Sequence, residues 1–384
     1  MADMILTEEE QMLQNLAHDF ADKELMPRAK EVDDKEEFSW ETWKGMSDLG
    51  LTGISIDTKY GGGGGGYRQT AILASEIARG DASASVCLLT HVSLGTSTIQ
   101  RFGSEEQCQR FIPELTSGKK IAAWALTEPG GGSDAAALKT TAVERDGTYF
   151  LNGSKTFITN GAEADTVVVF ATHDTSKGYK GVSAFVVPRN SPGFQVNPLH
   201  GKMGMRGSST CELVFQDTPV PMENRLGEEG MGFRYAMSIL DTSRIIIAAQ
   251  CVGIGQAALE QAVRYAQQRE TFGKPIAQHQ AIQFMLADMA TDVYTARMAT
   301  MNAATLKDAD LPFNDQACMA KLMASEMCQR VASQAIQIHG GAGYFKDSPV
   351  ERIFRDARVT TIYEGTSEIQ RLVIARNILS QYQI

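Results

Sequence analysis

Residues 233–269 read FRYAMSILDTSRIIIAAQCVGIGQAALEQAVRYAQQR. Apolar residues recur at helical spacing throughout this stretch, which is far longer than the ~11 residues of an average globular helix. Helices of this length are stabilised by packing in bundles. Gly253 and Gly255 lie inside the stretch. Each costs about 1 kcal/mol relative to alanine, but small residues allow another helix to approach closely. The stretch therefore predicts a bundle of long helices.

The regions on either side of this stretch differ in their periodicity. Helical patterns also cover residues 280–307, 315–338 and 366–381, so residues 231–384 are predicted to form a helical bundle. Residues 119–230 contain short runs rich in Val, Thr, Ile and aromatic residues, separated by Gly, Asp and Asn. This pattern is typical of a small β-barrel or sandwich.

The N-terminal region has a helical pattern again. Thr7 precedes three glutamates, and a hydroxyl followed by acids favours a helix start. Six consecutive glycines at residues 61–66 interrupt the helical pattern and predict a loop. The predicted fold class is therefore α+β, with a helical domain at 1–118, a β-domain at 119–230 and a helical bundle at 231–384.

The composition indicates a folded protein that binds neither nucleic acid nor metal. Of the 384 residues, 43% are hydrophobic, the net charge is −10, and no Lys/Arg run is long enough for a nucleic-acid-binding patch. The six cysteines form no CxxC pair, so we expect no metal site and buried, reduced thiols. The acidic N-terminus resembles neither a signal nor a transit peptide, and no stretch approaches the ~18 uninterrupted apolar residues of a membrane span. We expect a cytoplasmic bacterial protein with no membrane segment. The mature form of a mitochondrial matrix protein is the alternative.

Residues 124–134, WALTEPGGGSD, form the densest candidate site. A strand is expected to end at Leu126–Thr127, after which Pro129 and three glycines turn the chain sharply. Such a loop can bring backbone N–H groups and the Ser133 hydroxyl up to a phosphate. A tight surface turn is the alternative interpretation. The stretch is neither a Rossmann fingerprint nor a P-loop, because neither the required helix, strand and acid nor a Gly-Lys-Ser/Thr sequence follows.

Three further stretches allow a functional and a structural interpretation. In residues 155–161, KTFITNG, alternation places Phe157 and Thr159 on one face, where they could hold a flat heterocycle, although taken alone Phe157 is interpreted as core. Residues 269–275, RETFGKP, end a long helix with Gly and Pro as stops. Residues 337–344, QIHGGAGY, end a helix in a glycine loop, and a lone histidine there is more often structural than catalytic.

The last candidate stretch is residues 362–368, IYEGTSE. Thr366 or Ser367 caps the final helix, and a helix N-terminus is a natural place for a phosphate. Glu364 lies just before this cap in a short, apolar-flanked loop. Taken alone, Glu364 is interpreted as a solvated loop acid.

In order and wording, these five stretches resemble the acyl-CoA dehydrogenase family over essentially the whole chain, and most closely its short-chain, butyryl-CoA-type members. Residues 127–134 and 362–366 are similar to the two signatures of the family. The resemblance implies an N-terminal helical domain, a middle β-domain, a C-terminal four-helix bundle and assembly as a homotetramer. It also implies FAD as cofactor, an acyl-CoA substrate and an electron-transferring flavoprotein as partner. The six-glycine loop is richer in glycine than the family pattern.

The resemblance also assigns residues to the cofactor and the substrate. The flavin and its pyrophosphate would be lined by Trp124, Leu126, Thr127, Gly132, Ser133, Phe157, Ile158 and Thr159. The FAD of a neighbouring subunit would be reached by Arg269, Phe272, Gln280, Gln337, Gly340 and Gly341. The adenosine side would be held by Thr366, Ser367 and Glu368. The substrate would be contacted by Ser133, Asp241, Thr242, Ser243, Arg244, Tyr363 and Gly365.

The implied reaction is the dehydrogenation of a short-chain acyl-CoA to the trans-2-enoyl-CoA. Glu364 would abstract the α-proton while FAD takes the β-hydride, and the backbone N–H of Glu364 would help to stabilise the developing enolate. A free glutamate has a pKa of about 4.3, which burial beside an acyl chain would raise toward the operating pH. Some relatives carry the carboxylate on the long helix, where this chain has Ser243, so Glu364 is the implied base.

Other functions are kept as alternatives. The same chemistry could act on a branched, alicyclic or aryl-substituted acyl-CoA, since the sequence does not set the depth of the acyl pocket. That pocket is expected to be bordered by Val86, Cys87, Thr90, His91 and Tyr363. An acyl-CoA oxidase and a non-catalytic nucleic-acid-binding flavoprotein are less favoured, the latter because the net charge is negative.

Overall fold

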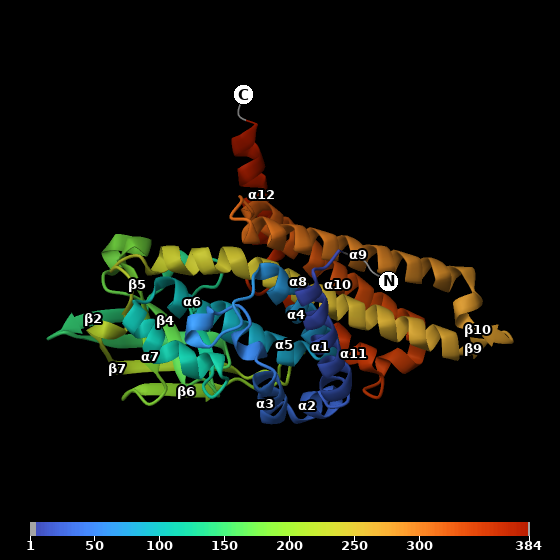
Figure 1. Ribbon diagram of the computed structural model, residues 1–384, viewed down its shortest axis with the longest axis horizontal. Coiled ribbons are helices and arrows are strands. Elements are labelled where there is room, and N and C mark those ends of the chain that lie inside the picture. Colours follow the sequence, from blue (N-terminus) through green and yellow to red (C-terminus); the bar gives the residue numbers. More distant parts are fainter. Residues whose placement is uncertain (1–4, 383–384) are drawn as a thin grey trace.

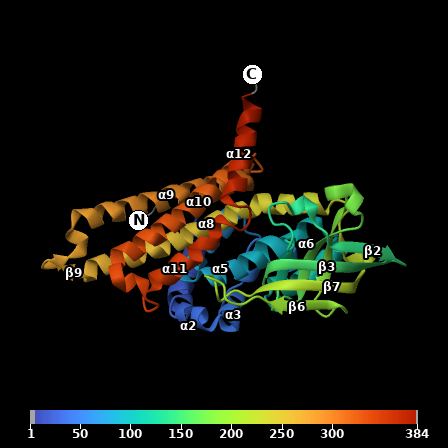
Figure 2. The same cartoon turned by 180° about the vertical axis from the view of Figure 1, so that it is seen from behind.

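The computed structural model describes residues 5–382 and arranges them in three parts (Figures 1 and 2). A β-sheet lies at one end of the molecule, long helices extend to the other end, and the N-terminal helices lie alongside. This is the predicted α+β arrangement of a helical part, a β-domain and a helical bundle.

The N-terminal part is helical, as predicted. Its first helix is capped by Thr7, whose Oγ1 accepts the N–H of Glu10 at 3.2 Å, while the N–H of Thr7 donates to the Glu10 carboxylate at 3.0 Å. This reciprocal cap satisfies two backbone donors. Two π-helical segments, Ala21–Leu25 and Thr90–Thr96, follow α1 and α5. The helices are α1 Glu8–Phe20, α2 Ala29–Lys35, α3 Trp40–Asp48, α4 Tyr67–Gly80, α5 Ala82–Leu89, α6 Ser97–Phe102 and α7 Glu105–Thr116.

The six-glycine run at residues 61–66 is a loop, as predicted, and it is fixed by its own backbone. The N–H groups of three of its glycines donate to carbonyls within residues 53–56 at 2.8–2.9 Å. A Cβ atom at Gly62 would lie 2.1 Å from the carbonyl oxygen of Ile56, so only glycine fits there. The run is therefore a packed turn rather than a linker.

The middle part is one eight-stranded sheet with the order β6-β7-β3-β2-β4-β5-β8, in which β1 pairs with β4 in parallel. All of β4 is buried, because its two faces pack into two different apolar clusters, one of which includes helical residues such as Ile112 and Ala236. Strands β5 and β7 also contact each other although they are not neighbours in the sheet, so the sheet curls toward itself. The strands are β1 Ala122–Ala125, β2 Thr141–Arg145, β3 Thr148–Thr159, β4 Thr166–Thr172, β5 Val182–Pro188, β6 Phe194–Pro198, β7 Thr210–Pro221 and β8 Arg225–Leu226.

Helix α8, Gly232–Gln268, runs from the sheet to the far end of the bundle (Figure 1). A Cβ atom at Gly253 would lie 2.1 Å from the Ser75 carbonyl oxygen in α4, and one at Gly255 would lie 2.8 Å from the Met327 sulfur in α10. The two glycines therefore permit close helix packing, as predicted. The remaining elements are the β9–β10 hairpin, Glu270–Thr271 and Lys274–Pro275, and α9 Gln280–Asp308, α10 Asn314–His339, α11 Pro349–Ala357 and α12 Ser367–Gln381.

Helix α8 is long and apolar enough to cross a membrane by length and composition, the one such helix within residues 5–382. However, 78% of its most apolar window is buried inside the protein, as expected for a core helix.

The N-terminal part and the bundle are also joined at the first turn of α4. The carboxylate of Asp308, at the end of α9, accepts the N–H of Tyr67 at 2.6 Å and that of Arg68 at 2.9 Å. A carboxylate at this position satisfies helix-terminal donors and interacts favourably with the helix dipole. The start of α4 therefore depends on a residue supplied by the bundle.

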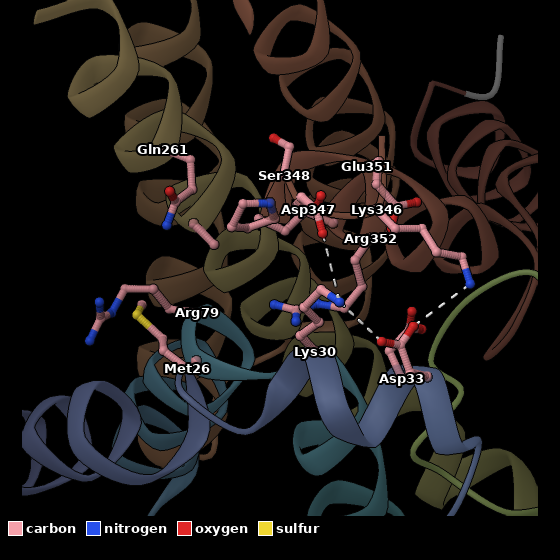
Figure 3. Close-up of a pocket in the computed structure, with 15 residues that line it drawn as sticks. Met26, Lys30, Asp33, Arg79, Gln261, Lys346, Asp347, Ser348, Glu351 and Arg352 are labelled. Atoms are coloured by element: carbon pink, nitrogen blue, oxygen red, sulfur yellow. Dashed lines mark hydrogen bonds and ion pairs between the residues drawn. The ribbon is translucent and has the colours of Figure 1, made fainter. Parts of the chain in front are cut away.

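A charged pocket marks a second junction, where α2 faces the start of α11 (Figure 3). Lys30 pairs with Asp34 at 3.2 Å and Lys346 with the same carboxylate at 3.7 Å. Beside the pocket, Arg355 of α11 pairs with Asp33 of α2 at 2.6 Å. These charges are paired with one another, and none of the predicted site residues lines the pocket.

Candidate active site

Glu364 lies in a tight turn between the 3-10 helix Arg358–Thr361 and α12. Its φ is +53° and that of Gly365 is +90°, so both residues have the left-handed conformation that is unfavourable for a glutamate. The Gln370 side-chain amide donates to the carbonyls of Glu364 and Gly365 at 3.3 and 3.1 Å, and Lys321 Nζ donates to that of Gly365 at 2.7 Å. In the described part of the chain, no hydrogen bond uses the backbone N–H of Glu364. The turn is thus held rigidly and leaves this N–H available to a ligand.

The Glu364 carboxyl group points at α8. The Ser243 hydroxyl lies 2.6 Å from Oε2 of Glu364 and 3.1 Å from the Leu240 carbonyl oxygen. A hydroxyl has one proton, so Ser243 donates to the carboxylate when Glu364 is ionised, and it can donate to Leu240 when Glu364 is neutral. Burial raises the pKa of Glu364, and the Ser243 hydrogen bond and the charges of Lys321 and Arg244 oppose this rise. Interpreted alone, Glu364 was expected to be a solvated acid, and the structure corrects this.

The other predicted substrate residues lie on the same stretch of α8 and on the turn. Arg244 Nη1 donates to Asp241 at 2.7 Å, and its buried Nε has no partner within the described residues. Thr242 is buried and its hydroxyl donates to its own helix at 2.9 Å. The Tyr363 phenol donates to the Gln250 side chain at 2.5 Å. The structure thus brings Ser243, Arg244 and Tyr363 to Glu364, and Asp241 lies beside Arg244.

Residues 127–134 form an open loop with an anchored start. The buried Glu128 carboxylate accepts the N–H groups of Lys139 and Thr140 at 2.6 and 2.9 Å and pairs with Lys155 Nζ at 2.8 Å. Lys155 is completely buried and also donates to the Leu126 carbonyl at 3.1 Å. By contrast, nothing lies within 4 Å of a Cβ atom built on Gly130 or Gly132. The glycines and the exposed Ser133 therefore face open space that a phosphate can enter.

Strand β3 presents an aromatic ring beside this loop. The Phe157 side chain is 70% exposed and its φ is +58°, whereas Ile158 on the opposite face is buried. The interpretation of Phe157 as core is wrong, and the strand does not alternate regularly here, because its register with β7 shifts between Lys155 and Ile158. Trp124 and Leu126 are instead buried in the core, and the Trp124 indole donates to Thr98 at 3.1 Å. An exposed ring next to an open glycine loop fits a flat heterocycle that carries a phosphate.

A second group of predicted cofactor residues lies elsewhere, at the end of the bundle far from the sheet (Figures 1 and 2). Arg269 follows α8, and Phe272 in the β9–β10 hairpin is 96% exposed. His339, at the end of α10, stacks on Tyr265 of α8 with ring centroids 4.2 Å apart, which places Gln337, Gly340 and Gly341 near Arg269. Gln280 begins α9 after the same hairpin. Within one chain, this group and the loop at 127–134 do not meet.

The predicted helix N-terminus at α12 is confirmed as a cap. Thr366 Oγ1 accepts the N–H of Ile369 at 3.2 Å, and the buried Ser367 hydroxyl has no partner within residues 5–382. Glu368 is exposed in the first turn. This helix therefore begins directly after the turn that carries Glu364.

His91 does not border an open pocket, contrary to expectation. Its Nε2 donates to the Leu115 carbonyl at 3.1 Å, its Nδ1 accepts the N–H of Ala122 at 2.9 Å, and its ring packs against Trp43. Burial lowers its pKa to about 4, so the imidazole is neutral. His91 is a core residue that joins α7 to β1.

The chain is similar to known proteins along nearly its whole length. Three family models match in order: the acyl-CoA dehydrogenase N-terminal domain at residues 7–119, the middle domain at 123–218 and the C-terminal domain at 230–379. The chain belongs to the acyl-CoA dehydrogenase family.

Individual members of the family are similar along nearly their full length. The short-chain specific acyl-CoA dehydrogenase of Rattus norvegicus mitochondria is 48% identical over 98% of this chain and 92% of its own. The structure of butyryl-CoA dehydrogenase from Megasphaera elsdenii matches with a TM-score of 0.96 at 44% identity, covering 98% of this chain and 99% of that one. A glutaryl-CoA dehydrogenase from Mycobacterium smegmatis, solved in complex with FADH2, matches with a TM-score of 0.93 at 29% identity, covering 98% and 95%. The acyl-CoA dehydrogenases are FAD-dependent oxidoreductases, and this chain is one of them.

The sequence analysis did not identify two residues that contact the loops of the candidate site. Lys155 and Lys321 are completely buried and donate to carbonyls of the two site loops. The sequence pattern could have identified both, because each is a lone lysine inside an otherwise apolar strand or helix face. A buried lysine needs partners, and these are a loop carbonyl for Lys321 and a loop carbonyl together with the Glu128 carboxylate for Lys155.

Replacing Glu128 by Gln is expected to loosen the 127–134 loop. The substitution leaves the buried Lys155 ammonium without its carboxylate, and breaking one partner of a buried ion pair costs about 3 kcal/mol. We expect a lower melting temperature and weaker FAD binding, measured by thermal denaturation and by the release of flavin fluorescence. Glu223→Gln removes an exposed charge from the same domain and is the control. Equal FAD affinity in the two variants would contradict the assignment of Glu128 as an anchor.

Proposed function

We propose that this acyl-CoA dehydrogenase converts a short-chain acyl-CoA to its trans-2-enoyl-CoA, with Glu364 as the base that removes the α-proton. The observation that carries the proposal is the turn at residues 362–366, which combines a carboxyl group against α8 with an unused backbone N–H on the same residue. A base and an oxyanion donor on one residue suit the removal of a proton next to a thioester carbonyl.

Glu364, Ser243 and Arg244 have different parts in the proposed reaction. Burial raises the pKa of Glu364 toward the operating pH, and Ser243 stabilises the ionised form by its hydrogen bond. The N–H of Glu364 would donate to the thioester oxygen as negative charge develops there. Arg244, whose Nε lacks a partner in the described chain, is placed to bind the CoA moiety. FAD, when bound, supplies the acceptor for the β-hydride.

The residues that would hold FAD lie at two distant places in the folded molecule, near the sheet and at the far end of the bundle. Phe157, the open glycines and Ser133 would bind the flavin and its pyrophosphate, and the cap at Thr366–Glu368 would face the adenosine side. Arg269 and its neighbours are too remote to reach the same cofactor, so they would reach the FAD of another subunit. The proposed assembly is a homotetramer.

Exposed apolar side chains support this assembly. They lie on α12, which projects from the rest of the chain, and at the far end of the bundle (Figures 1 and 2). Large apolar side chains that are exposed in one chain can be covered in an assembly. They are provided by Phe272, Tyr344, Leu372, Leu379 and Tyr382.

The proposed electron acceptor is an electron-transferring flavoprotein, and the proposed compartment is the cytoplasm of a bacterium. All six cysteines are free and buried, which fits a reducing compartment. The proposal includes no binding to nucleic acid or membrane. The net charge of −10 disfavours nucleic acid, and 78% of the most apolar window of α8 is buried inside the protein.

Replacing Glu364 by Gln should nearly abolish reduction of the bound flavin by substrate. The amide keeps the shape of the carboxyl group but cannot accept the α-proton, and Ser243 offers no carboxylate in its place. Stopped-flow absorbance of the flavin measures the rate, and binding of a non-reactive CoA thioether is the control that should stay near the wild-type level. A variant with more than a few per cent of the wild-type rate would show that another residue is the base.

The substrate assignment predicts the highest rate with a thioester of about four to six carbons. One methylene in such a pocket is worth only ~1–3 kcal/mol, so neighbouring lengths should also react. Butyryl-, isobutyryl-, octanoyl- and cyclohexanoyl-CoA are compared with an artificial acceptor and then with O₂ alone. A best rate with octanoyl- or cyclohexanoyl-CoA would contradict the short-chain assignment, and rapid peroxide formation would indicate an oxidase.

Arg269→Ala is expected to weaken FAD binding and the oligomer together. A guanidinium matches a pyrophosphate through paired hydrogen bonds, so its loss across an interface removes contacts from both. Bound flavin per chain and the mass by light scattering are measured on the same sample. Arg264→Ala, five residues earlier on α8 and exposed, is the control. A monomer that held FAD normally would refute the shared site.

A further inference from the structure

The side chain of Lys321, on α10, is completely buried and ends at the turn that carries Glu364. Its Nζ donates to the Gly365 carbonyl at 2.7 Å, and within residues 5–382 it forms no ion pair at salt-bridge distance. Burying an ammonium group without a directly bonded carboxylate is costly in free energy. The buried ammonium therefore lowers the stability of the fold, although it donates a hydrogen bond to a loop carbonyl.

The carbonyl that Lys321 contacts belongs to the residue after the proposed base. The Gly365 oxygen also accepts a hydrogen bond from Gln370 at 3.1 Å, so α10 and α12 hold it together. This grip maintains a left-handed φ at Glu364, which is unfavourable by about 1–2 kcal/mol for a residue with a Cβ atom. The same φ sets the directions of the Glu364 carboxyl group and N–H.

Lys321 also contributes charge to the base. Three groups act on the Glu364 carboxyl: Ser243 and Arg244 from α8, and Lys321 from α10. The Arg244 guanidinium is already paired with Asp241 at 2.7 Å. Lys321 is thus the cation facing Glu364 whose charge is not offset by a bonded carboxylate within the described chain.

The remaining titratable groups near Lys321 are neutral when protonated. They are the buried thiols of Cys251 on α8 and Cys328 on α10, and the Tyr363 phenol on the turn. Burial raises the pKa of Cys328 and of Tyr363, so these two groups supply no compensating negative charge near neutral pH. Burial opposes the ionisation of Cys251, but the hydrogen bond with Cys328 and the charge of Lys321 lower the pKa of its thiol. Lys321 and Arg244 are the cations that act on the Glu364 carboxyl group.

We propose that Lys321 is a positioning residue for the reaction: its ammonium fixes the Glu364–Gly365 turn and keeps a positive charge beside the base. This inference rests on the proposed function, in which Glu364 is the base. Without the ammonium, the turn would lose one of its two side-chain clamps, and the ionised carboxylate would lose a favourable charge.

Two neutral variants of the FAD-loaded oligomer separate these effects. Lys321→Met removes both the donor and the charge, whereas Lys321→Gln keeps an N–H donor and removes only the charge. Ser325→Ala, one turn further along α10, removes a buried polar group that contacts its own helix and is the matched control. The rate of flavin reduction by butyryl-CoA is measured against pH, together with the affinity for a non-reactive CoA thioether.

We expect the acidic limb of the pH–rate profile to move to higher pH in both variants, because the pKa of Glu364 rises when a nearby cation is lost. The maximal rate should fall on the order of 100-fold in Lys321→Met, since a misplaced base is inefficient, and less in Lys321→Gln. The affinity for the thioether should stay within about two-fold of the wild type. A general loss of stability would instead reduce bound FAD and thioether affinity without moving the pH profile.

An unchanged acidic limb in the variants would overturn the inference, and so would an equal shift in Ser325→Ala. If Lys321→Met does not fold, Lys321→Gln alone decides the matter by the same criterion. Glu364→Gln, measured in parallel, distinguishes the two failures. An active Glu364→Gln enzyme would refute the proposed function, whereas an inactive one beside wild-type behaviour of both Lys321 variants would refute only the part assigned to Lys321.

Discussion

The close packing of α8 against α4 is the constraint on which the rest of the molecule depends. At Gly253 the two helices approach so closely that a methyl group would overlap the Ser75 carbonyl. At its other end α8 approaches the sheet in the same way, because a Cβ atom at Gly232 would lie 2.4 Å from the backbone of Ser183. One helix thus fixes the spacing of all three parts, and it also carries Ser243, whose hydroxyl donates to Glu364, the proposed base. A shift along α8 would move this contact together with the domain contacts.

Two buried lysines donate hydrogen bonds to backbone carbonyl groups of two loops. Both loops turn sharply, and a sharp turn leaves carbonyl groups without the partners that a helix or sheet provides. Lys155 donates to Leu126 beside the glycine loop, and Lys321 donates to Gly365 beside the proposed base. An ammonium on a long stem reaches such carbonyls from a neighbouring element, so each loop is fastened to a rigid strand or helix rather than to itself.

The sequence predicts the elements better than their surroundings. Periodicity identified the long helix, the strand region and the Thr7 cap, because these follow from local spacing and local hydrogen bonds. The environment of Glu364 could not be found in this way, since its partner Ser243 lies 121 residues earlier. Phe157 was assigned to the core for a related reason: alternation gives the face of a strand but does not tell which face remains uncovered. The full set of candidate FAD residues came from the family resemblance, and their position at two distant places in the molecule could be seen only in the folded chain.

The cap on α4 has a consequence for synthesis on the ribosome. Tyr67 and Arg68 emerge roughly 240 residues before Asp308, the carboxylate that completes their helix end. During that interval the face of α4 that packs on α8 also lacks its partner, so the first domain to leave the exit tunnel cannot complete this helix end or cover this face alone. Nascent chains of this protein should therefore present a long-lived apolar surface, and chaperones that recognise such surfaces would act on it until the bundle is released.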